Sequence, residues 1–190
     1  MNLQEKTIYA LAGPYLKTRN NETHIRIVLQ FGFELLKHLN AKRSIVIPAI
    51  ILHDVGYSKL SADTLQQWCN DPWNYKLTKI HEMEGAKIAR NILEQTHYDP
   101  ELTDIICRMI GCHDTGGYTT VVEEQIMRDS DKLCRYTETA FKLDIVLYNL
   151  TLQEHYDRLE SSIDEWFYLP LSKQIAREHL KILKEKIALF

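Results

Sequence analysis

The chain has 190 residues, of which 45% are hydrophobic and 26% are charged, and its formal net charge at pH 7 is −3. These values are typical of a soluble globular protein, and we predict a single domain over residues 1–190. The acidic balance and the lack of a long basic run argue against binding of long nucleic acids, but a small phosphorylated partner is compatible with them.

We also expect no membrane partner, because the longest apolar run is far short of the ~20 residues needed to cross a bilayer. We expect no signal peptide, because the N-terminal residues show no basic patch followed by an apolar stretch. The four cysteines form no CxxC pair. Free thiols are the default in a reducing compartment, so we predict a cytoplasmic protein. A homodimer is a further candidate assembly.

Apolar residues recur at helical spacing along most of the chain, and no segment alternates as a strand would. We therefore predict an all-α fold, a helical bundle. The first helix is expected over 3–18, with a break at Gly13-Pro14, and a loop with short helical pieces over 57–76, with a turn at Asp71-Pro72. Later helices are expected over 77–95, from Pro100 onward to the glycines at 116–117, and over 121–136, 137–149 and 151–166, followed by a C-terminal helix.

The longest apolar run, from Ile45 to Leu52, ends in His53-Asp54. This run predicts a buried helix with an imidazole and a carboxylate at its end. We expect Pro48 near the start of that helix, where its missing N–H does least harm. Gly56 is expected in the left-handed conformation just past the helix end. Unpaired burial of the His-Asp pair would cost several kcal/mol, so these side chains need partners, such as each other or a metal ion.

Six imidazole and carboxylate side chains fall on apolar faces near helix ends. A single histidine of this kind is usually structural, but six together favour a metal site. This mixture of nitrogen and oxygen ligands suits Fe, Mn, Zn, Co or Ni, and the number of ligands suits two divalent ions that share a bridging carboxylate. The predicted ligands are His24, His53, Asp54, His81, His113 and Asp131.

The order of these residues resembles the HD-domain superfamily of metal-dependent phosphohydrolases. The sequence AIILHDVG is similar to the apolar-HD-apolar-Gly motif of that family, and RDSDKL is similar to its closing aspartate motif. The resemblance covers about residues 20–140 and leaves 141–190 as C-terminal helices. It implies an HD-domain bundle with the metal site between the central helices. The first ion would be held by His24, His53, Asp54 and Asp131, and the second would add His81 and His113 and share Asp54.

The sequence of this chain differs from that of many family members just after the His53-Asp54 pair. Where many members carry a lysine or a glutamate directly after the glycine, this chain has Tyr57, and Lys59 follows two residues later. Substrates of the corresponding subfamilies therefore do not transfer to this chain.

The resemblance predicts a phosphohydrolase that cleaves a nucleotide or another small phosphate ester with a metal-activated water. Asp54 is the predicted catalytic residue, which would bridge the ions and orient them. Basic side chains near the motifs would bind the substrate phosphate: Lys59, Arg128 and Arg135. Asp114 is either a proton shuttle or, as we favour, a turn residue. Two alternatives stay open, a di-iron oxygenase of the same fold and a non-catalytic metal-stabilised binding or signalling module.

Overall fold

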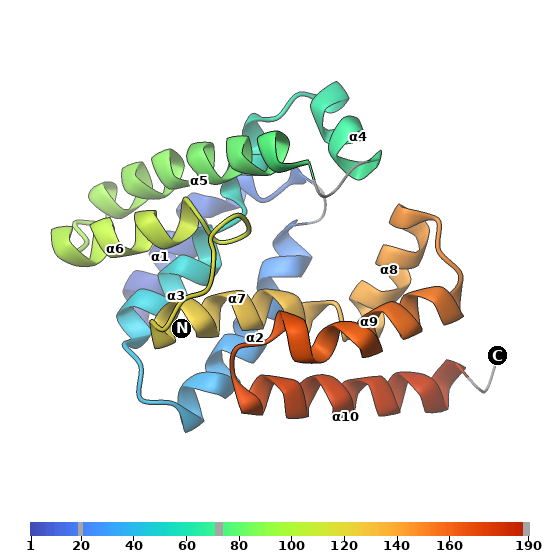
Figure 1. Ribbon diagram of the computed structural model, residues 1–190. Coiled ribbons are helices and arrows are strands. Elements are labelled where there is room, and N and C mark those ends of the chain that lie inside the picture. Colours follow the sequence, from blue (N-terminus) through green and yellow to red (C-terminus); the bar gives the residue numbers. More distant parts are fainter. Residues whose placement is uncertain (19–20, 71–73, 188–190) are drawn as a thin grey trace.

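The computed structural model describes residues 1–18, 21–70 and 74–187, and these residues form ten α-helices with short 3₁₀ turns and no strand (Figure 1). The all-α prediction is therefore confirmed. In chain order the elements are α1 (Leu3–Ala12), η1 (Gly13–Tyr15), α2 (Asn21–His38), α3 (Arg43–Leu52), η3 (Val55–Lys59), α4 (Ala62–Asn70), α5 (Tyr75–Gln95), α6 (Pro100–Ile110), α7 (Val122–Cys134), α8 (Glu138–Tyr148), α9 (Leu152–Trp166) and α10 (Pro170–Ile187).

The buried helix α3 is the centre of the arrangement. Every residue from Ile45 to Leu52 is buried, and the helix contacts α1, α2, α6 and α7. Figure 1 shows α5 and α6 side by side along one flank of the molecule, and α9 and α10 side by side along the other. Burial of a continuous apolar helix removes a large apolar area from water, which is the main favourable term in folding.

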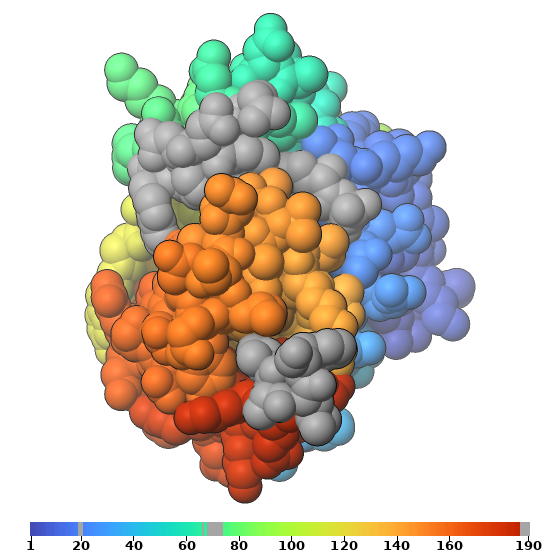
Figure 2. Space-filling model, turned by 90° about the vertical axis from the view of Figure 1, so that its right-hand side faces the viewer, coloured from blue at the N-terminus to red at the C-terminus, as the bar shows by residue number. Residues whose placement is uncertain are grey.

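The C-terminal helices extend the same apolar core. Phe141, Leu159 and Leu180, from α8, α9 and α10, belong to one contiguous cluster with the residues of α3. Figure 2 shows α8 and α9 together on one face of the molecule, between α10 and α4. Within the described ranges, no helix combines the length and the apolar character that a membrane span requires.

The prediction for Pro48 is wrong, because this residue lies in the interior of α3 rather than near its start. A proline there leaves the carbonyl of residue i−4 without its helical N–H donor. Here that carbonyl belongs to Ser44, and the Tyr98 hydroxyl donates a hydrogen bond to it at 2.6 Å. A side chain distant in sequence thus replaces the lost interaction and allows the helix to continue through Pro48.

The end of α1 and the start of α6 lie at the residues that the sequence predicts. Helix α1 ends at Ala12, and Gly13-Pro14 begins η1. The Asp99 side chain accepts hydrogen bonds from the N–H groups of Glu101 and Leu102, so it caps α6 at the predicted point. The expected loop over 57–76 contains η3 and the two-turn helix α4. The turn predicted at Asp71-Pro72 lies outside the described residues.

The prediction for Gly56 is also wrong, since no glycine among the described residues has a positive φ. Gly56 lies within η3, which packs directly on α5. A Cβ atom at this position would lie 1.9 Å from the His81 carbonyl oxygen and 2.6 Å from the Gly85 nitrogen. Glycine is required here by the close approach of two backbone segments, which brings His81 near the end of α3.

We expect Gly56→Ala to destabilise the protein by about 3 kcal/mol, because the clash is with backbone atoms that cannot rotate away. Urea unfolding followed by circular dichroism measures this change. Gly13→Ala is the matched control, since a Cβ atom there would meet nothing within 4 Å and its backbone is right-handed helical. Equal stability of the two variants would contradict the packing argument.

Candidate metal centre

The His53 side chain begins the site at the point where α3 ends. Its Nδ1 is 2.8 Å from the carbonyl oxygen of Ile50, an acceptor in the last turn of the helix. With the proton on Nδ1, this hydrogen bond fixes the ring and leaves Nε2 as a free ligand atom. The ring is buried, and the neighbouring Asp54 is held through its main-chain carbonyl, which accepts a hydrogen bond of 3.3 Å from the Asn21 amide.

His113 repeats this arrangement at the end of α6. The expected continuation of α6 to the glycines at 116–117 is wrong, since the helix ends at Ile110 and His113 lies in the following turn. Its Nδ1 is 2.8 Å from the Ile110 carbonyl oxygen, so the ring is oriented by the same contact at the same offset. Two helix ends thus place two Nε2 atoms near the same carboxylate oxygen, Oδ1 of Asp54.

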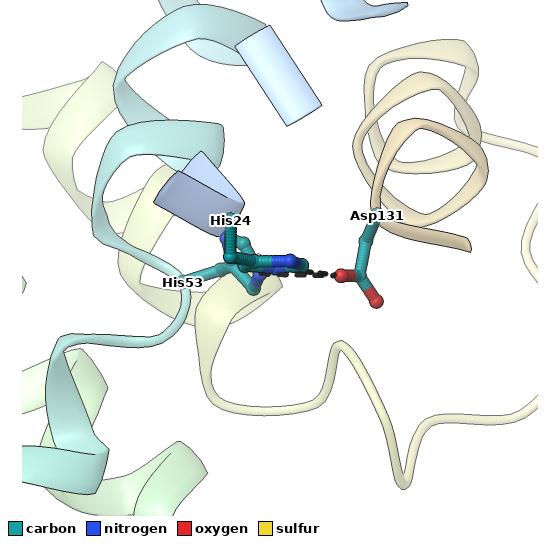
Figure 3. Close-up of side chains that lie close together, drawn as sticks. All are labelled: His24, His53 and Asp131. Carbon is teal, nitrogen blue, oxygen red and sulfur yellow. Dashed lines mark hydrogen bonds and ion pairs between the residues drawn. The ribbon is translucent and has the colours of Figure 1, made fainter. Parts of the chain in front are cut away.

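The first group of ligand atoms combines α2, α3 and α7. His24 lies in the first turn of α2, and its Nε2 is 3.0 Å from Asp131 Oδ1 and 3.3 Å from His53 Nε2. The distance from His53 Nε2 to Asp131 Oδ1 is 3.6 Å. Figure 3 shows the three side chains pointing toward one another from separate elements. Such a group of two imidazoles and a carboxylate could hold a metal ion.

The second group combines α5 with the turn after α6. His81 Nε2 is 3.4 Å from His113 Nε2 and 3.4 Å from Asp114 Oδ2. The His81 ring is buried and stacks on Tyr57, with 4.1 Å between ring centroids and an angle of 10° between planes. The residue that replaces the lysine or glutamate of other members thus supports a predicted ligand.

Asp54 lies between the two groups. Its Oδ2 is 3.5 Å from His24 Nε2, and its Oδ1 is 3.5 Å from His53 Nε2 and 3.6 Å from His113 Nε2. The six predicted ligand side chains therefore converge, with the shared carboxylate in the middle.

The carboxylates of the cluster favour a positive charge at its centre, either a proton or a bound cation. Burial alone would raise the pKa of the Asp54 carboxyl, but His53, His113 and His24 hold it well below its usual range. Burial and the charge on His113 lower the pKa of His81 to about 4, so this ring stays neutral. For His113, burial is outweighed by Asp114 and Asp54, which raise its pKa to about 10. Binding of a cation to this group would therefore displace a proton from His113.

Two buried charges fix the loop that carries His113. The Glu82 carboxylate accepts hydrogen bonds of 2.8 Å from the N–H groups of Asp114 and Thr115. At the other end, Arg128 donates to the carbonyl oxygens of Cys112, Gly116 and Gly117. These contacts give Arg128 a structural role in the loop. The residue also lines the cavity that contains the ligands, so its assignment to the substrate phosphate stays a prediction.

A cavity of about 910 Å³ contains the predicted ligands His24, Asp54, His113 and Asp131 in its wall and extends to residues of α8 and α9. Arg135 lines it and forms a 3.0 Å ion pair with Asp144, so its assignment to the substrate phosphate stays a prediction. Lys59 is exposed at the end of η3 and is not part of this wall.

Two residues near the ligands, Glu82 and Lys132, are not predicted from the sequence. Lys132 follows Asp131 directly and lines the cavity, and Asp114, for which a turn is the favoured prediction, lines it as well. The adjacency of Asp114 to His113 and of Lys132 to Asp131 was the only signal in the sequence. Glu82 gave none, because its role depends on a loop 32 residues away.

Comparison with known proteins agrees with this geometry. The comparison with curated proteins found no match, and neither did the comparison with solved structures. The family model of the HD domain matches residues 21–136, a range that includes all six predicted ligands. The chain therefore belongs to the HD-domain superfamily of metal-dependent phosphohydrolases.

Proposed function

We propose that this protein is a metal-dependent phosphohydrolase that acts on a nucleotide or another small phosphate ester. The observation that carries the proposal is the position of Asp54 between two groups of imidazole and carboxylate ligands in the wall of a large cavity. One carboxylate shared between two ligand groups is the arrangement expected for two ions that act on one phosphoryl group.

The donor set fits two divalent transition ions, such as Fe, Mn, Zn, Co or Ni. Neutral imidazole nitrogens and carboxylate oxygens are suitable ligands for these metals, whereas Ca²⁺ prefers oxygen alone. The first ion would be held by His24, His53, Asp54 and Asp131. Bound divalent ions supply a water of lowered pKa and stabilise charge on phosphoryl oxygens.

The protein's own contribution is orientation and charge. Asp54 would hold both ligand groups in a fixed relation through its two oxygens, and the Nδ1 contacts of His53 and His113 would keep the rings from rotating. Arg135 and Lys132 line the same cavity and supply positive charge for phosphate oxygens outside the metal centre. A cavity of about 910 Å³ is large enough for a nucleotide-sized molecule.

One prediction of this proposal concerns the metal content of the protein. We expect Asp54→Ala to lose both ions, because each ligand group loses a carboxylate that the other residues cannot replace. Metal analysis of purified protein by mass spectrometry measures this loss. The control is Asp104→Ala, which removes an exposed carboxylate that pairs with Arg90 on the surface. Full metal retention by the Asp54 variant would exclude the proposed centre.

Another prediction of this proposal concerns phosphate release. We expect the Mn²⁺-loaded protein to release inorganic phosphate from members of a panel of nucleotides and small phosphate esters. Arg135→Gln should raise the KM roughly tenfold with a smaller change in kcat, since a charge-assisted hydrogen bond to substrate contributes about 1.5 kcal/mol.

Arg177→Gln is the matched control, because Arg177 forms a surface ion pair with Asp164 and does not line the cavity. Metal-loaded protein without phosphate release from any panel member would overturn the proposal. Oxygen consumption would then favour the di-iron oxygenase, and its absence a binding module.

A further inference from the structure

We propose that Asp114 is a further metal ligand, which completes the second ligand group and gives each ion its own carboxylate. The inference rests on the metal centre of the proposed function and adds a residue that neither the motifs nor the family comparison assigns. It changes the expected second site from two imidazoles and a shared carboxylate to a set of four side chains.

The distances place Asp114 in the second group as Asp131 is placed in the first. Asp114 Oδ2 lies 3.4 Å from His81 Nε2 and 3.6 Å from His113 Nε2. Asp131 Oδ1 lies 3.0 Å from His24 Nε2 and 3.6 Å from His53 Nε2. Each group therefore has two histidines and one aspartate of its own.

Asp54 lies close to a histidine of each ligand group. Its Oδ2 is 3.5 Å from His24 Nε2 in the first group, and its Oδ1 is 3.6 Å from His113 Nε2 in the second. With Asp114 included, each ligand group consists of two imidazoles, one carboxylate of its own and the carboxylate of Asp54, which both groups share. Four ligands of this kind are enough to hold a divalent transition ion with positions left for substrate.

A buried carboxylate fixes the backbone at Asp114 through hydrogen bonds. The fully buried Glu82 accepts hydrogen bonds of 2.8 Å from the N–H groups of Asp114 and Thr115, and one of 2.6 Å from the Thr115 hydroxyl. Lys79 adds an ion pair of 3.0 Å with the same carboxylate. Burial of a carboxylate is costly unless it is paired and hydrogen-bonded in this way. Glu82 is thus a positioning residue that holds the main chain of Asp114 beside the histidines.

The side chain itself remains accessible from the cavity. The Asp114 side chain is 36% exposed, and the residue lines the cavity wall together with His113 and Thr115. A ligand carboxylate needs this combination of a fixed backbone and a side chain that faces the space where the ion and the substrate meet.

The test is the number and the magnetic coupling of bound ions, which does not depend on activity. After loading with Mn²⁺ and dialysis, we expect about two ions per wild-type chain. For Asp114→Ala we expect about one ion and a second-site Kd about 10- to 100-fold weaker. Electron paramagnetic resonance should show an exchange-coupled pair in the wild type and a single uncoupled Mn²⁺ in the variant.

Two matched variants define the comparison. Asp131→Ala removes the corresponding ligand of the first group and should likewise leave about one uncoupled ion. Asp157→Ala removes an exposed carboxylate on α9 that accepts a hydrogen bond from Gln153 and should keep the coupled pair. Circular dichroism of the metal-free proteins checks that all variants are folded.

The result that overturns the inference is an Asp114→Ala protein that keeps a coupled pair with unchanged affinity, or a wild type that binds a single ion. Phosphate release by such a protein would leave the proposed function intact. Conversely, loss of one ion in Asp114→Ala without any phosphate release in the wild type would support the ligand and reject the phosphohydrolase.

Discussion

The hydrogen bonds from Nδ1 of His53 and His113 to the ends of α3 and α6 determine where the ligand atoms of this protein lie. In each case the acceptor is a carbonyl three residues earlier, at 2.8 Å. A helix end always has carbonyl groups without helical partners, so each contact satisfies a main-chain acceptor and orients a ligand at once. Since α3 and α6 pack on one another, the packing of these two helices is enough to bring the two rings together around Asp54.

The second constraint is the contact between η3 and α5. Gly56 allows the two backbones to approach within a distance that no side chain would permit. This approach puts Tyr57 flat against His81 and places His81 Nε2 3.4 Å from His113 Nε2. The second ligand group therefore depends on the close approach at Gly56 and on the stacking of Tyr57 against His81. Stability and metal binding are coupled at this point of the fold.

Much of this architecture could be predicted from the sequence. The helical spacing gave the fold class, the Asp99-Pro100 pair gave the start of α6, and the ordered imidazoles and carboxylates gave the six side chains that converge. What could not be predicted depends on residues far apart in the chain. Pro48 is accommodated within α3 by the hydroxyl of Tyr98, and the turn that holds Asp114 is fixed by Glu82. No local pattern encodes either contact, because both exist only after the helices have packed.

The proposed ligands also explain how an acidic chain could select an anionic substrate. The net charge is −3, so attraction by a broad basic surface is not available. Three carboxylates, Asp54, Asp114 and Asp131, lie at the ligand groups, and two divalent ions would leave the centre with a net charge of about +1. The positive charge would then be confined to the cavity wall that Arg135 and Lys132 also line. The cavity of about 910 Å³ also has the size that a small phosphate ester requires. Selection by charge and selection by size would thus arise from the same arrangement.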